Sequence, residues 1–481
     1  MKKKKIIVLI GTVVAINIFA SILTFKHVTN ADSLNNFQET KIHLCDTYFD
    51  PFTGDESPNT NKLKILPQYS SEVSTGYSNN DGTVTLDVYS NPIRFINSNN
   101  QLQDIDTRIT NVDDQSMRDA GYVYTIASDD IQSFYPKSLQ TGILIKKNDF
   151  NYTFGINQSN EILAQYVNKE NIVNNKINMI EYKNAFSQNS KFDLYPSNLG
   201  TNSEIILDKK PNSNEMNFWL NADNCNVSLE EGGYISMKTD QVVQAGLGYT
   251  TNQVIGIIQA PLLKDANGKV SFHSRFYLNQ ISDGKYTITM DLDKAFLNDK
   301  ATKYPVKAFS AFELYRDKQP DSAIYSSQQF LNSYLSNYSI IGNSDTYGKG
   351  ENRIRFNFAK GINLQSSQII KATYSVYNFS NKNPKDNLEL CTMQDDWCSL
   401  ISHWNDGIKY GNCTSSLKMD SGPILPFDIT QEVKKWCDAP DGLAEHKGVL
   451  LRSKDEQEGI WNVIMSNDNS LYNNRTELIL K

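Results

Sequence analysis

Short segments in which apolar and polar residues alternate recur along most of this 481-residue chain. Residues 83–89 and residues 285–291 are clear examples. Because successive side chains of a strand point to opposite faces of a sheet, this alternation is typical of strands with one buried face. Clusters of Asn, Asp, Ser and Gly separate the segments, and such clusters predict turns. The pattern therefore predicts an all-β chain.

Helical periodicity is rare by comparison. Residues 294–298 predict a single helical turn, and residues 430–436 predict a short helix that Asp428 is placed to cap. Val433 and Trp436 would face inward from that helix. Further strands are predicted at residues 91–96, 102–106, 121–127, 142–147, 152–156, 203–208, 216–221 and 254–258.

The spacing of these strands predicts tandem β-sandwich domains rather than a solenoid. We expect an N-terminal β domain over residues 67–177, a second over residues 178–320, and a jelly-roll-like sandwich over residues 325–481. The sequence leaves open whether residues 67–320 form one domain or two. Residues 32–66 are rich in Asn, Asp, Thr and Lys and lack periodicity, which predicts a linker.

The first 31 residues have the layout of an export signal. Residues 2–5 are all Lys, residues 6–25 form a long apolar run, and residues 29–31 are small or polar. The apolar run is also long enough to span a bilayer, which takes roughly 20 residues. A cleaved signal peptide and an uncleaved membrane anchor therefore both remain open. In either case we expect a secreted or surface-exposed chain that contacts the membrane only through this segment.

The net charge bears on the class of binding partner, and the cysteine content bears on disulfide formation. The formal net charge is -7, which argues against a nucleic-acid partner because such proteins normally carry a basic patch. An exported chain permits disulfides. Four cysteines lie close together in the C-terminal third, and four cysteines allow three pairings that the sequence does not resolve. These candidate disulfide residues are Cys391, Cys398, Cys413 and Cys437.

The C-terminal third resembles a DNRLRE-type module, classed as family 96 of the carbohydrate-binding modules. The motifs that carry the resemblance are residues 353–356, 369–377, 404–405, 427–430 and 448–452, with Val433 and Trp436. Upstream motifs at residues 89–93, 103–106, 135–136, 260–268 and 297–306 resemble the region that precedes this module in clostridial and bacillar wall-associated and Rhs-type proteins. The resemblance implies a β-sandwich, export and attachment to polysaccharide or the cell wall.

Aromatic residues of the module are candidates for a sugar-stacking platform. Trp404 and Trp436 match framework positions of the resemblance, and buried Trp is common, so we expect both in the core. Trp397 and Trp461 lie beside polar stretches and are the better candidates for an exposed platform. Core packing is the competing interpretation for these two residues as well.

Basic residues of the same module are candidates for binding sugar carboxylates through charge-assisted hydrogen bonds. Arg353 and Arg355 should share one face of a strand because their spacing is two residues. Arg452 lies within the motif at residues 448–452. An ion-paired sandwich face is the alternative for all three.

No cofactor is expected, and catalytic motifs are not recognised. Asp265 to Gly268, or Asp291 with Asp293, offers oxygen ligands for a structural calcium ion, although turn chemistry favours a plain turn. The chain lacks Gly-x-Ser-x-Gly, His-Glu-x-x-His and a phosphate loop. We therefore expect a non-catalytic protein whose partner is a polysaccharide or cell-wall glycan. The alternative is a structural or protein-interaction component of the envelope, such as an adhesin stalk.

Overall fold

The computed structural model describes residues 62–156, 162–170, 176–247, 249–314, 321–328, 336, 338–356, 358, 364–380, 386–399, 402–419, 424–439, 446–466 and 475–481. The expected export segment, residues 1–31, lies outside these residues, as does most of the expected linker. The end of that linker forms a strand, β1 (Lys62–Leu66). Within the described part of the chain, no helix combines the length and the apolar character that a membrane crossing requires.

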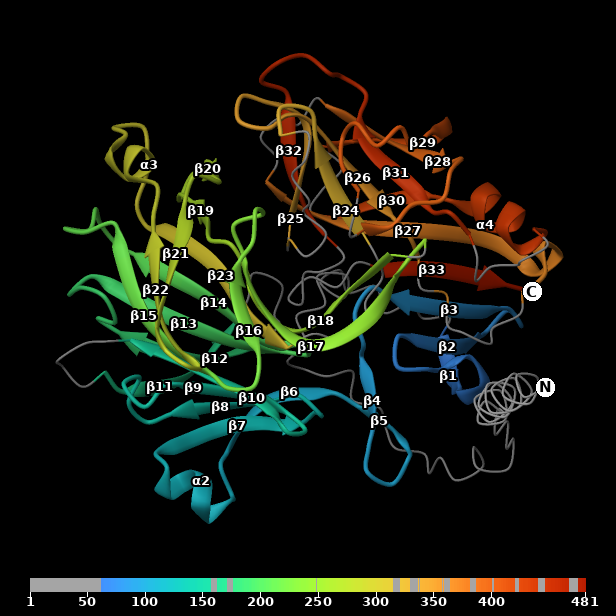
Figure 1. Cartoon of the computed structure of the whole chain (residues 1–481). Helices are drawn as coiled ribbons and strands as arrows, with labels where there is room; N and C mark the ends of the chain where they lie inside the picture. The colour runs from blue at the N-terminus through green and yellow to red at the C-terminus, as the bar shows by residue number, and fades with distance from the viewer. Residues whose placement is uncertain are drawn as a thin grey trace, which may run out of the picture. The chain divides into compact units, whose positions relative to one another are not determined.

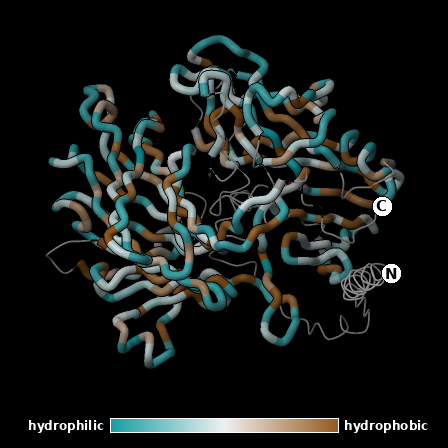
Figure 2. The backbone as a smooth tube through the Cα atoms, in the orientation of Figure 1, coloured by the Kyte–Doolittle hydropathy of each residue, from teal (hydrophilic) through white to brown (hydrophobic). Residues whose placement is uncertain are grey.

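The prediction of an all-β chain with sandwich-type domains is confirmed, since the described strands pair into open antiparallel sheets. Figure 1 shows the strands of these sheets coloured by their position in the chain, and Figure 2 shows the hydropathy of each residue along the same backbone. The predicted strand at residues 285–291 is β22 (Lys285–Asp291), in which every second residue is buried. Alternation along the sequence therefore corresponds to one buried face per strand.

One sheet of the first sandwich combines strands from both of the expected N-terminal domains. Its pairing order is β21 (Arg275–Ser282), β22 (Lys285–Asp291), β15 (Glu215–Ala222), β10 (Phe150–Ile156), β9 (Ile143–Lys147), β8 (Gln132–Pro136), β7 (Tyr122–Ser128) and β6 (Asp106–Asn111). The pairing of β10 with β15 crosses the boundary that we expected at residue 177.

The second sheet of this sandwich crosses the same boundary. Its order is β11 (Ala164–Glu170), β12 (Lys176–Lys183), β13 (Ser190–Ser197), β14 (Gly200–Leu207), β23 (Val306–Leu314), β18 (Tyr249–Ile258), β17 (Ile235–Gly246) and β16 (Asn226–Leu229), with β19 (Leu262–Lys264) and β20 (Val270–Ser271) beside β23. Phe154 of β10 stacks on Phe312 of β23, with ring centroids 3.5 Å apart. The two sheets thus enclose one core, so the described strands between residues 106 and 314 share a single sandwich.

The long strand β27 (Ile369–Ser380) is central to the C-terminal sandwich. It pairs antiparallel with three other described strands. Along the main pairing path the order is β1, β2 (Ser74–Asn79), β3 (Val84–Tyr89), β33 (Arg475–Leu480), β27, β32 (Trp461–Met465), β25 (Tyr338–Ser344), β26 (Gly348–Ile354), β31 (Val449–Ser453), β28 (Asn387–Met393) and β29 (Tyr410–Lys418). Two more strands attach to this path, β24 (Asp321–Tyr325) to β26 and β30 (Ile424–Asp428) to β27.

The first described strands belong to this C-terminal sandwich. Residues Val84 to Tyr89 pair antiparallel with residues Leu480 to Arg475, and Figure 1 shows β3 in blue beside β33 in red. Leu86 and Val88 of β3 join a core that also contains Tyr374 and Phe427. The domain boundary expected at residue 67 therefore does not coincide with a break between sheets, because chain segments far apart in sequence complete one core.

Short elements complete the fold. A two-stranded ribbon pairs β4 (Arg94–Ile96) with β5 (Leu102–Asp104). The predicted helical turn is α3 (Lys294–Asn298), which Asp293 caps. The predicted C-terminal helix is α4 (Thr430–Cys437), with Val433 and Trp436 buried as expected. The remaining short helices are η2 (Pro67–Tyr69), α2 (Gln115–Asp119) and η3 (Ser366–Gln368).

Candidate functional site

A pocket of about 240 Å³ lies in the C-terminal sandwich. Strands β24, β26, β28 and β31 supply part of its wall, and the segment from Trp404 to Tyr410 supplies an aromatic part. The lining residues are Ile324, Lys349, Glu351, Arg353, Met393, Trp404, Ile408, Tyr410, Leu450 and Glu456. The pocket lining therefore combines apolar residues, two aromatic side chains and four charged groups.

Strand β26 brings three of the charged groups to one wall. Lys349, Glu351 and Arg353 are spaced by two residues, and side chains at that spacing share one face of a strand. The predicted site residue Arg353 is thus part of the pocket. Arg355 follows the end of β26 and turns elsewhere, donating to the Trp397 carbonyl over 2.9 Å and pairing with Asp396.

Arg353 is almost completely buried, with 3% of its surface exposed. Its guanidinium binds both carboxylate oxygens of Asp406, with 2.8 Å between Nη2 and Oδ1. Burial alone would raise the pKa of Asp406, but the hydrogen bond and the positive charge of Arg353 lower it overall. Asp406 therefore stays ionised against Arg353.

The same carboxylate organises the turn that carries Trp404. The backbone N–H groups of His403 and Ile408 donate to Asp406 over 3.2 Å and 3.1 Å. Trp404 lies between these two donors in the chain, is half-buried and lines the pocket. Strand β26 consequently positions an aromatic wall of the pocket through one ion pair.

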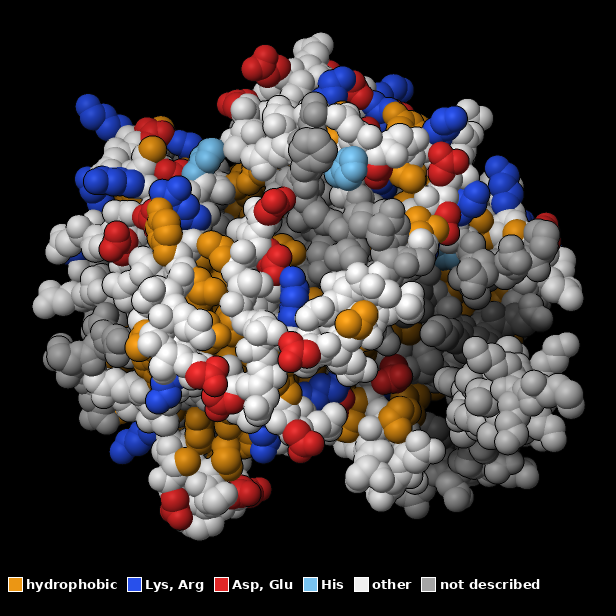
Figure 3. Space-filling model, in the orientation of Figure 1, with side chains coloured by type: hydrophobic (Ala, Val, Ile, Leu, Met, Phe, Trp, Pro, Cys, Tyr) orange, Lys and Arg blue, Asp and Glu red, His pale blue; other side chains and the backbone are white. Residues whose placement is uncertain are grey.

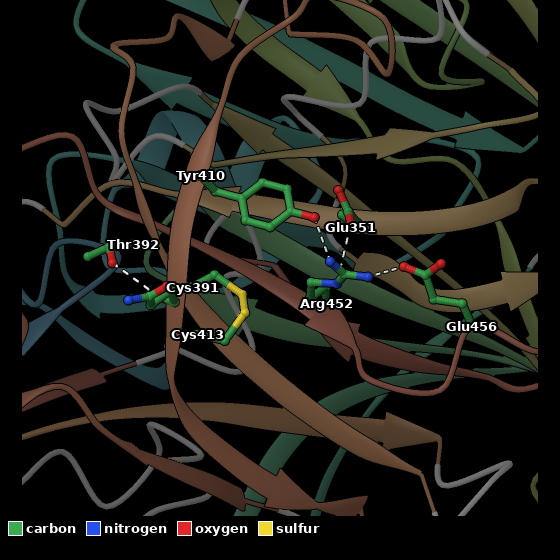
Figure 4. Close-up of a disulfide and its surroundings, with 8 residues drawn as sticks. Glu351, Cys391, Thr392, Tyr410, Cys413, Arg452 and Glu456 are labelled. Carbon is green, nitrogen blue, oxygen red and sulfur yellow. Dashed lines mark hydrogen bonds and ion pairs between the residues drawn. A yellow bond between two sulfur atoms is a disulfide. The ribbon is translucent and has the colours of Figure 1, made fainter.

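Arg452, the third predicted basic residue, does not line the pocket itself but contacts three residues that do. Its guanidinium contacts the Glu456 carboxylate, donates to the Tyr410 hydroxyl, and lies 3.6 Å from Oε1 of Glu351 (Figure 4). Lys349 forms a second ion pair with Glu456. Burial raises the pKa of Glu351, which the neighbouring Arg452 and Arg353 only partly offset.

The structure buries both tryptophans that were candidates for a platform and places Trp404, expected in the core, at the pocket. Trp397 is 2% exposed and donates its indole N–H to the Lys447 carbonyl over 2.8 Å, while Trp461 is 7% exposed. Buried rings cannot offer a stacking face, so neither candidate forms an exposed platform, and both fit the competing interpretation of core packing. Trp404 lines the pocket rather than packing in the core. Trp436 is buried and stacks on His446.

Sequence reasoning missed several pocket residues. Tyr410, Glu456 and Lys349 carry no motif, and only the three-dimensional arrangement brings them together. One usable signal was present in the alternation of Lys349, Glu351 and Arg353, because three charges at period two on a strand must share a face. This signal was hard to recognise because residues on both faces of that strand are mostly polar or glycine.

A disulfide joins Cys391 of β28 to Cys413 of β29. This is one of the pairs that the sequence allowed. Cys398 is buried and Cys437 is half-buried, and burial raises the pKa of the Cys437 thiol to about 11. Because Tyr410 begins β29, the disulfide anchors the strand from which that aromatic side chain extends (Figure 4).

The carboxylates of both calcium candidates are engaged by hydrogen bonds or ion pairs within the described chain. The Asp265 carboxylate accepts hydrogen bonds from the backbone N–H groups of Asn267, Lys269 and Lys303, over 2.8 to 2.9 Å. Asp293 caps α3 and accepts from the Ser271 hydroxyl. Asp291 accepts from Asn214 and pairs with Arg275. Across the described ranges, no three His, Cys, Asp or Glu side chains are grouped to hold a metal ion.

No family model matches this chain, and no curated protein matches it. The resemblance to the DNRLRE-type module therefore stays a prediction that depends on the short motifs themselves.

Proposed function

We propose that this chain is an exported, non-catalytic protein that attaches to a polysaccharide of the cell surface or its surroundings through the pocket of the C-terminal sandwich. The observation that carries the proposal is the placement of Trp404 and Tyr410 beside fixed charged groups. Ligand pockets combine apolar and aromatic walls with a few precisely held polar groups. Sugars match such a lining because each ring has an apolar C–H face and a rim of hydroxyls.

The charged groups of the pocket are held rigid before any ligand arrives. Arg353 is fixed by Asp406, and Glu456 is fixed by Arg452 and Lys349. Groups that are already positioned lose little conformational entropy on binding. This supports recognition of hydroxyl groups by direct, charge-assisted hydrogen bonds.

The arrangement of the two pocket carboxylates supports attachment rather than hydrolysis. A glycosidase places a scissile bond between two carboxyl groups. Here the guanidinium of Arg452 contacts both Glu351 and Glu456 and bridges them. Release of sugars from labelled wall polysaccharide by the purified protein would favour a hydrolase instead.

Export is supported by the layout of residues 1–31 and by the disulfide between Cys391 and Cys413. Disulfides persist mainly in oxidising compartments, outside the cytosol. Fractionation of the producing cells tests this part directly. Recovery of the protein in the cytosolic fraction would contradict it.

Retention of the secreted protein on insoluble cell-wall polysaccharide tests the attachment. Trp404→Ala and Tyr410→Ala should each weaken retention by about tenfold, since an aromatic ring in a binding site contributes on the order of 1–3 kcal/mol. Tyr277→Ala is the matched control, because Tyr277 is 46% exposed on β21 and lies outside the pocket. Equal retention of all three variants and the unaltered protein would contradict the pocket assignment.

A further inference from the structure

We propose that the pocket selects a neutral sugar ring and rejects uronic acids. This inference rests on the proposed function and narrows its ligand class. It differs from the expectation that arginines of this module bind sugar carboxylates. The reason lies in how the charges around the pocket are already paired.

Each cation at the pocket is matched by a carboxylate of the same site. Arg353 pairs with Asp406, Lys349 pairs with Glu456, and Arg452 lies against Glu456 and Glu351. Three positive groups thus face three negative groups, and the site carries no net formal charge. The carboxylate of a uronate entering this pocket would have to displace an Asp or Glu side chain of the protein from its cation.

Arg353 is the least able to exchange its partner. It is 3% exposed, it binds both oxygens of Asp406, and it also donates to the Ser402 hydroxyl over 3.3 Å. Turning its guanidinium toward a ligand would leave Asp406 without its counter-charge in a mostly buried position. The turn that presents Trp404 would lose its anchor at the same time.

Arg452 does not line the pocket, and neighbouring side chains of the site engage its guanidinium. Its three nitrogens contact Tyr410, Glu456 and Glu351, and only 17% of its side chain is exposed. Lys349 is more exposed, at 43% of its side chain, but it is paired with Glu456. An incoming carboxylate at Lys349 would therefore meet the negative charge of Glu456 directly, and like charges at close range repel.

A neutral ring meets none of these penalties. Sugar hydroxyls both donate and accept, so they can donate to Glu351 and Glu456 while accepting from Lys349. Trp404 and Ile408 offer an apolar wall for the C–H face. The volume of about 240 Å³ is below the roughly 300–1,000 Å³ of pockets for drug-sized ligands, which suits one ring rather than several.

The formal net charge and the face drawn in Figure 3 offer no long-range attraction for a polyanion. The whole chain has a formal net charge of -7. On the face drawn in Figure 3, basic and acidic side chains of the described residues are interspersed. Steering of an anionic chain needs a field of one sign, which this face does not supply.

Affinity electrophoresis of the secreted full chain, through gels containing a neutral glucan, a neutral mannan or a polyuronate, tests the inference. We expect at least one neutral polymer to retard the protein equally at about 50 mM and about 500 mM NaCl, since a neutral ligand has no charge to screen. The polyuronate should leave mobility unchanged. Retardation by the polyuronate alone would overturn the inference and leave the proposed function standing, whereas migration unaffected by every polymer would contradict both.

Glu456→Gln provides the decisive variant. It removes the carboxylate that pairs with Lys349 and Arg452. Binding of the neutral polymer should weaken by about tenfold, because a charge-assisted hydrogen bond to the sugar is lost. It should also create measurable binding to the polyuronate. Glu231→Gln, at an exposed turn of the other sandwich, is the control. Neutral binding that survives Glu456→Gln and Trp404→Ala in folded protein, as judged by circular dichroism, would place the ligand elsewhere and overturn the inference.

Discussion

Arg353 binds both carboxylate oxygens of Asp406, and Asp406 in turn accepts the backbone N–H groups of His403 and Ile408. This relationship connects a central strand of the C-terminal sandwich to the turn that carries Trp404. One buried ion pair therefore determines both local stability and the shape of the pocket.

Replacing Asp406 by Asn should destabilise the folded chain and weaken ligand binding together. The change leaves Arg353 buried without its counter-charge, and breaking a buried pair from one side costs about 3 to 5 kcal/mol. Urea unfolding followed by tryptophan fluorescence measures the loss. Asp345→Asn, at an exposed turn, is the control and should change stability little.

The same pair gives a pH dependence of defined sign. The pKa of Asp406 is lowered from its ordinary value of 3.8, so its stabilising contribution is complete above that value. It is lost as the pH falls through the lower folded-state pKa. Unfolding curves of Asp406→Asn should consequently converge toward those of the unaltered protein in strong acid. A constant difference across the whole range would contradict this assignment.

Removing the disulfide should lower stability and loosen Tyr410. Cys391 and Cys413 are separated by 22 residues, and the loop-closure model gives about 3 kcal/mol for a bridge of that length. The double variant Cys391→Ser with Cys413→Ser should show that loss in thermal or urea unfolding. Cys437→Ser tests whether removal of any thiol has the same effect. Sugar affinity should fall in the double variant because β29 carries Tyr410.

His446 should make the C-terminal sandwich sensitive to mild acid. Burial lowers its pKa from 6.5 to about 4, and Nε2 donates to the Phe356 carbonyl over 2.9 Å. Between these two pH values the unfolded chain binds a proton that the folded chain does not, so stability falls as the pH decreases. The shift corresponds to about 3 kcal/mol.

His446→Gln is the variant that tests this sensitivity. It should flatten the dependence of unfolding free energy on pH between about 6.5 and about 4. His273→Gln, at an exposed position, should leave the dependence as it is in the unaltered protein. Identical pH profiles for His446→Gln and the unaltered protein would rule out His446 as the cause.

Alanine variants of Trp397 and Trp404 should distinguish a tryptophan that packs in the core from one that contacts the ligand. Trp397→Ala removes a ring that is 2% exposed and should cost about 3 to 5 kcal/mol of stability. Trp404→Ala removes a half-buried ring at the pocket, so it should affect sugar retention more than stability. Paired unfolding and retention measurements on both variants check this. A stability loss for Trp404→Ala as large as that for Trp397→Ala would make Trp404 a core residue.

Local pattern was sufficient to predict the class of most elements. Alternation at residues 285–291 specified β22, because a strand with one buried face needs an apolar side chain at every second position. The pattern of residues 294–298 likewise predicts one helical turn, which is α3 in the structure, where Asp293 caps it. Both features depend only on neighbours within a few residues, so they are visible in a linear sequence.

Long-range pairing decided everything that concerns the site. The sequence by itself determined that the chain is all-β and where many of its strands lie. Only the tertiary structure decided that β3 pairs with β33, that Trp397 is buried, and that Trp404 lines the pocket. Burial of a ring depends on which distant strands pack over it, and no local pattern of residues records that partner.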